Sequence, residues 1–302
     1  MHRLVKQPLE WAISSPTIGW MTQHRVRGKR LILAYHGIIP EGQAPAGDRA
    51  LFVAQRDFAM HLDLLAAEAD VAPLDRIDDP GDGRPRVAIT FDDAYSGAVN
   101  EGVGELVKRN LPATIFVAPG RLNGHVFWWD ALSTRHEALD ERVRHHALHE
   151  VAGADERIRA WAASTGLPVS GSQPPYLRAA TRGELDAALA FPGITVGSHT
   201  WSHRNLAALG VDDVDDEVRD SREWLRAEFG DKAIDWLAYP YGLDSNDVHL
   251  SVAKASYAGA LRIGGGWHSP TDVSPLARPR FSIGSGLSVA GLRARLNGAR
   301  LS

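Results

Sequence analysis

The stretch RVAITFDD, residues 86–93, is a run of apolar and β-branched residues that ends in two carboxylates. Three other runs have a similar form. LILAYHG at 31–37 and ITVGSH at 194–199 each reach a histidine, and WLAYPYG at 236–242 reaches a turn. Short apolar runs bounded by polar or turn residues are typical of buried strands. The four runs therefore predict four strands that carry polar or turn residues at their carboxyl ends.

Amphipathic stretches between these strands predict helices, for example at 98–110, 212–229 and 247–257. Further short apolar runs predict strands at 71–74, 113–119, 259–263 and 280–283. Strands that alternate with helices about seven times predict an α/β fold with a parallel sheet. Because that many units in one sheet fit a closed arrangement better than an open one, we expect a distorted (β/α)7-type barrel of mainly parallel strands.

One domain, residues 30–302, accounts for this pattern, and residues 1–29 are expected to form an N-terminal extension. The segment from about 121 to 180 breaks the alternation of strands and helices. It holds Trp128-Trp129-Asp130, a histidine-rich helix candidate at 135–151 and a stretch rich in Gly, Ser and Pro. We interpret this segment as a helical insertion within the domain, with a lid as one role that it can have.

The composition is that of a globular protein, because 44% of the 302 residues are hydrophobic and 23% are charged. The net charge of -4 and the lack of a basic run argue against nucleic acid as a partner. No segment has the about 20 apolar residues of a membrane span. Residues 1–30 also lack the unbroken apolar core of a signal peptide. We expect a cytoplasmic protein without a membrane span, and the sequence predicts no oligomeric state.

The chain has 13 histidines and no cysteine, so a metal site must use His, Asp or Glu. His199 and His203 are four residues apart, a spacing that lets two imidazoles on one helical turn bind the same cation. In a parallel barrel, catalytic groups lie at the carboxyl ends of the strands, where we expect His199 and the Asp92-Asp93 pair. Burial of these groups without partners is costly, and a shared divalent cation offsets that cost.

Each of these signals also has an ordinary structural interpretation. An Asp-Asp pair is common in turns and helix caps. His145 and His149 repeat the four-residue spacing within the charged stretch RHHALH, which we interpret as a solvated helix face. His36 is either a structural residue at the end of its strand or a proton donor. Tryptophans such as Trp129 and Trp267 either pack in the interior or stack on sugar rings.

Three motifs, TFDD at 90–93, SHTWSH at 198–203 and YPYG at 239–242, occur in the order found in polysaccharide deacetylases. The chain resembles that family, also called NodB-homology or carbohydrate esterase family 4 proteins, over about residues 30–285 apart from the insertion. The combination of the three motifs is specific, although each alone is common. The resemblance implies a role for each motif residue. Asp92 corresponds to the catalytic base, Asp93, His199 and His203 to the metal ligands, and the backbone N–H of Tyr241 to the oxyanion donor.

The acid that protonates the leaving group in this family is a histidine in an L-x-x-H motif, usually near the C-terminus. The C-terminal residues of this chain contain no such histidine, whereas Leu33-Ala34-Tyr35-His36 fits the motif. This placement resembles the circularly permuted exopolysaccharide or poly-N-acetylglucosamine deacetylases and makes His36 the candidate acid. We expect His36 to lie across the metal from Asp92, and His268 is the next candidate.

The third motif departs from the family pattern. Relatives usually carry an arginine two residues before the proline of this motif, where it contacts the catalytic Asp, and this chain has Ala238 there. Arg278 or Arg280, in the stretch ARPR, is a candidate to reach Asp92 from another strand. We select Arg280 as the residue that tunes the base.

The resemblance implies a metal-dependent hydrolase that removes N-acetyl groups from the amino sugars of a poly- or oligosaccharide and releases acetate. Zn²⁺ is the first choice for two His and one Asp ligand, and Co²⁺ or Ni²⁺ suit similar ligands. Trp129, Trp267 and Pro240 are the expected substrate contacts. Two alternatives stay open. One is hydrolysis of another C–N bond or of an O-acetyl group at the same site, and the other is a catalytically impaired glycan-binding homologue, which Ala238 suggests.

Overall fold

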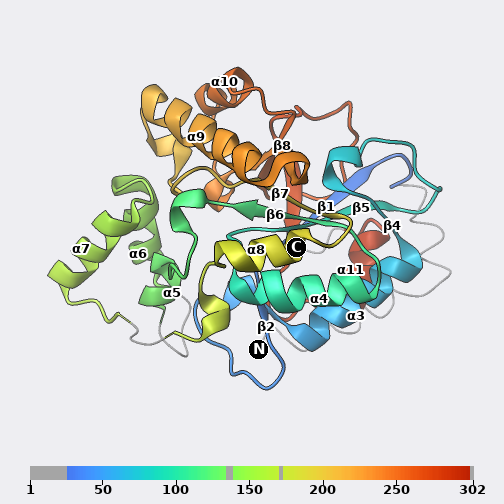
Figure 1. Cartoon of the computed structure of the whole chain (residues 1–302), viewed down its shortest axis with the longest axis horizontal. Helices are drawn as coiled ribbons and strands as arrows, with labels where there is room; N and C mark the ends of the chain where they lie inside the picture. Colours follow the sequence, from blue (N-terminus) through green and yellow to red (C-terminus); the bar gives the residue numbers. More distant parts are fainter. Residues whose placement is uncertain (1–25, 134–138, 170–172, 300–302) are drawn as a thin grey trace.

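The structure is a computed structural model that describes residues 26–133, 139–169 and 173–299 (Figure 1). Most of the expected N-terminal extension, residues 1–25, lies outside the described residues. So do residues 134–138, which overlap the start of the histidine-rich helix candidate. The domain limits at residues 30 and 302 therefore stay a prediction.

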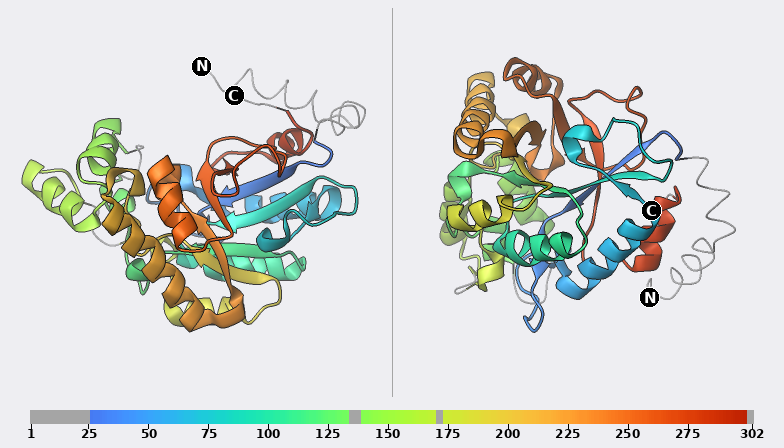
Figure 2. Two further views of the ribbon diagram at one scale, coloured as in Figure 1. Left: turned by 90° about the horizontal axis from the view of Figure 1, so that it is seen from above. Right: turned by 45° about the vertical axis from the view of Figure 1, so that its right-hand side comes forward.

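Seven parallel strands close into a barrel within the described part of the chain (Figures 1 and 2). Their hydrogen-bonded order is β1-β10-β9-β8-β7-β6-β5, and β5 pairs with β1 to close the ring. The strands are β1 Arg30–Tyr35, β5 Arg86–Phe91, β6 Ala113–Val117, β7 Ile194–Ser198, β8 Ala233–Ala238, β9 Gly259–Ile263 and β10 Arg278–Ser282. The predicted (β/α)7-type barrel is confirmed.

Three short strands lie beside the barrel. β4, Asp70–Val71, pairs with the first two residues of β5. β2, Gly37–Ile39, follows His36 directly and pairs with β3, Phe52–Ala54, in a separate small sheet. The strand expected at 71–74 is wrong beyond Val71, because Pro73 has no N–H to donate to a neighbouring strand and the chain turns into a short helix there.

Helices cover the outside of the barrel. They are α3 Gln55–Glu68, α4 Val103–Lys108, α8 Arg182–Leu189, α9 Val211–Phe229, α10 Asn246–Lys254 and α11 Val289–Leu296. The predicted helix at 98–110 begins as one wider π-helical turn before α4. α8 starts at a capping box, in which Thr181 and Glu184 each accept the other's backbone N–H through their side chains. α9 ends at Gly230, whose φ of 52° is in the left-handed region.

The segment that interrupts the alternation folds into a group of short helices beside the barrel, seen at the left of Figure 1. These helices are α5 Trp128–Leu132, α6 Glu141–His145 and α7 Asp155–Thr165. Two hydrogen bonds join this group to the loop that follows β7. Asn205 donates its side-chain N–H to the carbonyl of Leu148 and its backbone N–H to that of Ala152.

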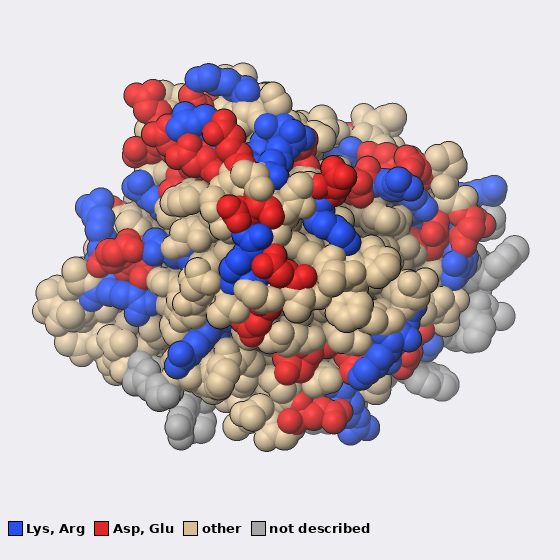
Figure 3. Space-filling model, in the orientation of Figure 1, with Lys and Arg blue, Asp and Glu red and all other residues tan. Residues whose placement is uncertain are grey.

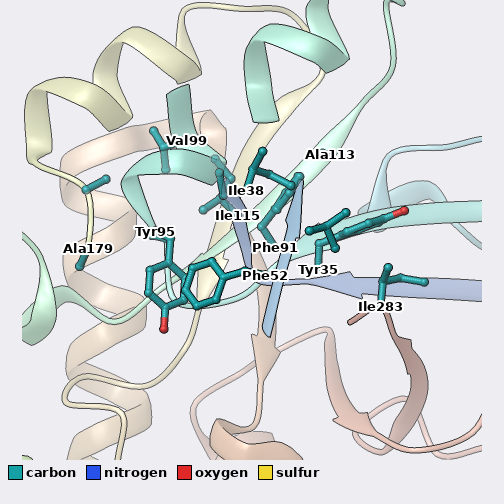
Figure 4. Packing of buried hydrophobic residues seen from close by; sticks show 14 of the residues in the cluster. Tyr35, Ile38, Phe52, Phe91, Tyr95, Val99, Ala113, Ile115, Ala179 and Ile283 are labelled. Carbon is teal, nitrogen blue, oxygen red and sulfur yellow. The ribbon is translucent and has the colours of Figure 1, made fainter. Parts of the chain in front are cut away.

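The hydrophobic core includes side chains from the last residues of β1 and β5 (Figure 4). The rings of Tyr35 and Phe91, from neighbouring strands, lie 5.7 Å apart, and Phe52 meets Tyr95 edge-on at 5.0 Å. Tyr35 and Phe91 are fully buried and directly precede His36 and Asp92. Packing of the core therefore fixes the two strand ends from which polar side chains emerge.

Charged side chains of both signs mix on the face shown in Figure 3, where carboxylates gather over α9. Several of them pair locally, for example Asp216 with Arg219, and Asp215 with Lys254 of α10. No helix of the described chain has the length and apolar character needed to cross a bilayer.

Candidate active site and metal centre

Polar or turn residues lie at the carboxyl ends of four barrel strands. His36 follows β1, Asp92 follows β5, His199 follows β7, and Pro240 begins the turn after β8. Because all the barrel strands are parallel, these positions share one face of the barrel.

Asp93, His199 and His203 form the candidate metal centre. One ligand atom from each lies within 4.8 Å of the other two, and all three residues are buried. The Nε2 atoms of the two histidines are 3.1 Å apart, and they lie 3.5 and 3.1 Å from Oδ1 of Asp93. This Oδ1 is fully buried and has no hydrogen-bond partner among the residues that the structure describes. A buried carboxylate and two imidazoles that face one another fit a divalent cation between them.

The tautomer of His199 suits ligation. Its Nδ1 lies 2.7 Å from the carbonyl oxygen of Ala238, so Nδ1 carries the proton and donates it. In the neutral ring Nε2 then presents its lone pair toward His203 and Asp93, as metal-binding histidines do when a carbonyl holds their other nitrogen. Burial alone would raise the pKa of Asp93, but its two histidine neighbours hold that pKa below the usual range.

The loops that carry these ligands adopt uncommon backbone conformations. Asp93 and Ala94 have φ of 67° and 49°, and Thr200 and His203 have φ of 62° and 59°. A left-handed residue other than glycine costs about 1–2 kcal/mol, so surrounding contacts must hold it. The N–H of Ala180 donates to the carbonyl of Ala94, and the N–H of His203 donates to Oγ1 of Thr200. In these conformations Oδ1 of Asp93 lies 3.1 Å from Nε2 of His203.

Arg280 binds Asp92 through both carboxylate oxygens. Its Nη1 and Nη2 donate to Oδ1 and Oδ2 at 2.6 and 2.7 Å, and Nη1 also donates to Oγ1 of Thr90. Burial raises the pKa of Asp92, but Arg280 and His199 outweigh that effect and leave the pKa below its usual range. Arg280 thus occupies the place expected for a base-tuning arginine, whereas Arg278 binds Asp78 instead.

His36 lies beside Asp92, with its Nε2 3.8 Å from Oδ2 of that carboxylate. The expectation that His36 lies across the site from Asp92 is wrong. β1 and β5 are neighbours, and Tyr35 pairs in register with Phe91, so the next residue of each strand must be adjacent. Asp92 consequently has a guanidinium and an imidazole as close neighbours.

Pro240 and Tyr241 lie in a tight turn after β8, where Tyr241 has φ of 61°. The ring of Tyr241 stands edge-on to that of His203, with centroids 4.8 Å apart. The Tyr241 hydroxyl donates to the carbonyl of His203 and accepts the indole N–H of Trp128. The structure therefore places the third motif against the loop that carries the candidate metal ligand His203.

Two expected substrate contacts do not present an open surface at the site. Trp129 is only 4% exposed, and its ring stacks on Phe127 and lies 5.0 Å from the His203 ring. It packs against the candidate metal ligand His203 and is too buried to stack on a sugar ring. Trp267 donates its indole N–H to the carbonyl of Arg295 in α11.

The loop from β9 to β10 places Trp267 and His268 at the wrong end of the barrel. His268 exchanges two backbone hydrogen bonds with Arg30, the first residue of β1. At about 3.3 Å per strand residue, Arg30 lies about 17 Å from Tyr35. Because β9 and β10 are parallel, the loop between them runs back from the carboxyl end of β9 to the amino end of β10. Trp267 and His268 lie in this returning part of the loop. The expectations that Trp267 binds substrate and that His268 is a reserve acid are therefore wrong.

His145 and His149 remain apart from the candidate metal centre. Both are exposed on the inserted helices, with ring centroids 4.9 Å apart. The one cluster of three ligand residues found in the described chain, Asp93, His199 and His203, does not include them. Their place on an exposed face agrees with the interpretation made from the sequence.

Sequence reasoning did not assign two side chains that touch the site, Tyr95 and Asp130. The hydroxyl of Tyr95 donates to Oδ2 of Asp130 at 2.6 Å, and Asp130 is fully buried. Burial raises the pKa of Asp130 to about 8. The one signal in the sequence was position, because Tyr95 follows the TFDD motif and Asp130 ends the Trp-Trp-Asp triplet.

The model of the family described as polysaccharide deacetylase matches residues 79–260. The chain belongs to this family. The matched polysaccharide deacetylase region includes Asp92, Asp93, His199, His203 and Tyr241, and it leaves out β1 with His36 and β10 with Arg280. The expected resemblance and the hydrolase class that it implies, a carbohydrate deacetylase, are confirmed at the level of the family.

No curated protein sequence gives a significant match to the chain. Solved structures of similar fold include the Streptococcus pyogenes deacetylase PplD in complex with acetate, with 18% identity, a TM-score of 0.63 and coverage of 89% of this chain and 99% of that one. A polysaccharide deacetylase from Bacillus cereus has 18% identity and a TM-score of 0.64 over 89% of this chain and 69% of its own. IcaB from Ammonifex degensii has 17% identity and a TM-score of 0.60, with coverage of 89% and 97%. At such identities the likeness shows the fold.

Proposed function

We propose that the protein is a metal-dependent hydrolase that removes N-acetyl groups from the amino sugars of a poly- or oligosaccharide and releases acetate. One observation carries the proposal: Asp93, His199 and His203 converge at the carboxyl face, beside an Asp92 that Arg280 holds through both oxygens. Two imidazoles and one carboxylate leave coordination positions open for water and substrate, as catalytic sites require. Zn²⁺ suits these ligands best, and Co²⁺ and Ni²⁺ fit them as well.

The bound ion would lower the pKa of a water molecule and polarise the acetyl carbonyl. Asp92, in its ionised form, accepts a proton from the attacking water. Arg280 keeps the two Asp92 oxygens in a fixed plane and favours the ionised carboxylate. The base therefore has both the charge and the orientation that proton transfer needs.

The remaining steps use Tyr241 of the third motif and His36, which follows β1. The backbone N–H of Tyr241, in its tight turn, donates to the oxyanion of the tetrahedral intermediate. His36 gives a proton to the departing amine, and its Nε2 lies 3.8 Å from the carboxylate of Asp92.

The case for a catalytically impaired glycan-binding homologue rested on Ala238 alone. Arg280 supplies a guanidinium to Asp92 from a different strand, so that argument no longer applies. Cleavage of another C–N bond or of an O-acetyl group would use the same groups. Acetate release from N-acetylglucosamine oligomers, small N-acetyl amides and O-acetylated sugars separates these substrates. The proposal expects the oligomers to be cleaved best, and preference for either of the other two would contradict it.

A further inference from the structure

Three consecutive residues of one helical turn, Trp128, Trp129 and Asp130 of α5, make hydrogen bonds to parts of the active site that lie far apart in the sequence. Trp128 contacts the turn after β8, and Trp129 and Asp130 contact the loop after β5. The ring of Trp129 also packs on His203, in the loop after β7. One turn of the inserted segment therefore joins all three motif loops.

Asp130 holds the loop that carries Asp93. Its Oδ2 accepts the Tyr95 hydroxyl at 2.6 Å, and its Oδ1 accepts the backbone N–H of Asp48 at 2.9 Å. Tyr95 is two residues beyond Asp93, across the left-handed Ala94. Because only Ala94 separates Asp93 from Tyr95, the hydrogen bonds that hold Tyr95 also restrict the backbone of Asp93.

Trp129 also holds the Tyr95 hydroxyl. Its indole N–H donates to the Tyr95 hydroxyl at 2.8 Å, while its ring lies against His203. The same side chain thus touches the loop of one metal ligand and the ring of another. Its burial and its stacking on Phe127 leave it little freedom to move.

Trp128 acts on a different group. Its indole N–H donates to the Tyr241 hydroxyl, which in turn donates to the carbonyl of His203. Tyr241 has a left-handed backbone, and its N–H is the proposed oxyanion donor. Loss of the Trp128 hydrogen bond would therefore disturb the oxyanion donor more than the metal ligands.

We propose that Trp129 and Asp130 are positioning residues that set the geometry of the metal centre, and that Trp128 is a positioning residue for Tyr241. This inference rests on the proposed metal site. In this proposal the inserted segment holds the three motif loops in position through hydrogen bonds, and it does not act as the lid considered from the sequence. Outer partners of metal ligands typically contribute about 10–100-fold to metal affinity.

The test measures the Zn²⁺ dissociation constant by competition with a chromophoric chelator, which needs no turnover. Asp130→Leu removes both hydrogen bonds, and we expect it to weaken Zn²⁺ binding about 10–100-fold. Asp130→Asn keeps an acceptor for the Asp48 N–H and points an amide N–H at the Tyr95 hydroxyl, which can rotate to accept it. We expect its affinity within about 3-fold of the wild type. Asp155→Leu is the matched control. It removes another buried carboxylate of the insertion, one that binds Arg159 and His125, and should leave Zn²⁺ affinity unchanged.

Two tryptophan variants keep the test decisive if Asp130→Leu does not fold. Trp129→Phe should weaken Zn²⁺ binding, whereas Trp128→Phe should lower kcat with little change in Zn²⁺ affinity or KM. Wild-type Zn²⁺ affinity in Asp130→Leu or in Trp129→Phe, or an equal loss in Asp155→Leu, would overturn the inference. A wild-type protein that binds no Zn²⁺ would instead contradict the proposed metal site itself.

Discussion

The guanidinium of Arg280 binds both carboxylate oxygens of Asp92, and it reaches them from β10, two strands away from β5 in the barrel. Arg280 has no exposed surface and the Asp92 side chain is 3% exposed, so the pair is shielded from water and salt. The third motif has Ala238 at the position where an arginine was expected. Arg280 of β10 supplies the guanidinium that contacts Asp92 instead.

Arg280→Ala should lower both stability and activity. Removal of one partner of a buried ion pair leaves the other charge uncompensated, at a cost of about 3–5 kcal/mol in the free energy of unfolding. Arg278→Ala is the control, because Arg278 lies on the same strand as Arg280 but pairs with the partly exposed Asp78. Denaturant unfolding and acetate release measure the two effects. Equal kcat in the two variants would contradict the role of Arg280.

Asp92→Asn should keep Zn²⁺ binding and lose most activity. The substitution preserves the shape of the side chain but removes the proton acceptor, and general base catalysis typically contributes about 10²–10⁴-fold. The measurement combines a Zn²⁺ titration with the rate of acetate release. A fully active Asp92→Asn enzyme would overturn the assignment of the base.

His36→Ala should slow amide substrates far more than activated aryl esters. An amide needs protonation of its leaving nitrogen, whereas an aryl ester with a good leaving group largely does not. The ratio of kcat/KM for the two substrate types isolates this effect from general damage. If both substrates lose activity equally, His36 is a structural neighbour of Asp92.

Asp130 should give stability an unusual dependence on pH. An unfolded Asp has a pKa near 3.9, and burial raises the pKa of folded Asp130 to about 8. The folded state therefore holds one more proton between these values, and its free energy of unfolding falls as pH rises from about 4 to about 8. Asp48, Tyr95 and Asp93 are the titratable groups that act on Asp130.

Asp130→Asn removes that titration while it keeps a similar shape. The difference in unfolding free energy between variant and wild type should grow in favour of the variant from pH 5 to pH 8. Denaturant unfolding at several pH values measures it. A constant difference across this range would mean that Asp130 is ionised throughout.

The sequence predicted the strands well because each is a short apolar run that ends in polar or turn residues, as β5 and β7 illustrate. It also predicted which motif residues converge, since parallel strands deliver their carboxyl ends to one face. It named Arg280 in place of Arg278 without a structural reason, because the two lie two positions apart and so share one face of β10. Arg278 and Arg280 differ in their position along the barrel axis, which depends on the register between neighbouring strands.

Long-range contacts were beyond the reach of sequence patterns. The bond between Tyr95 and Asp130 joins residues 35 positions apart, and no periodicity encodes it. The errors at Trp267 and His268 have a similar origin. The loop between β9 and β10 is irregular, so the sequence contains no repeating pattern that shows its path. The place of His36 followed from the pairing of β1 with β5, which the sequence alone did not reveal.

The most direct test of the central claim is the Zn²⁺ content of the protein together with acetate release before and after chelation. We expect one tightly bound Zn²⁺ per chain in the wild type and in His149→Ala, and none in His203→Ala, although both histidines belong to pairs with the same spacing. Chelation should abolish acetate release from N-acetylglucosamine oligomers, and added Zn²⁺ should restore it. Full acetate release by the chelated, metal-free protein would contradict the account.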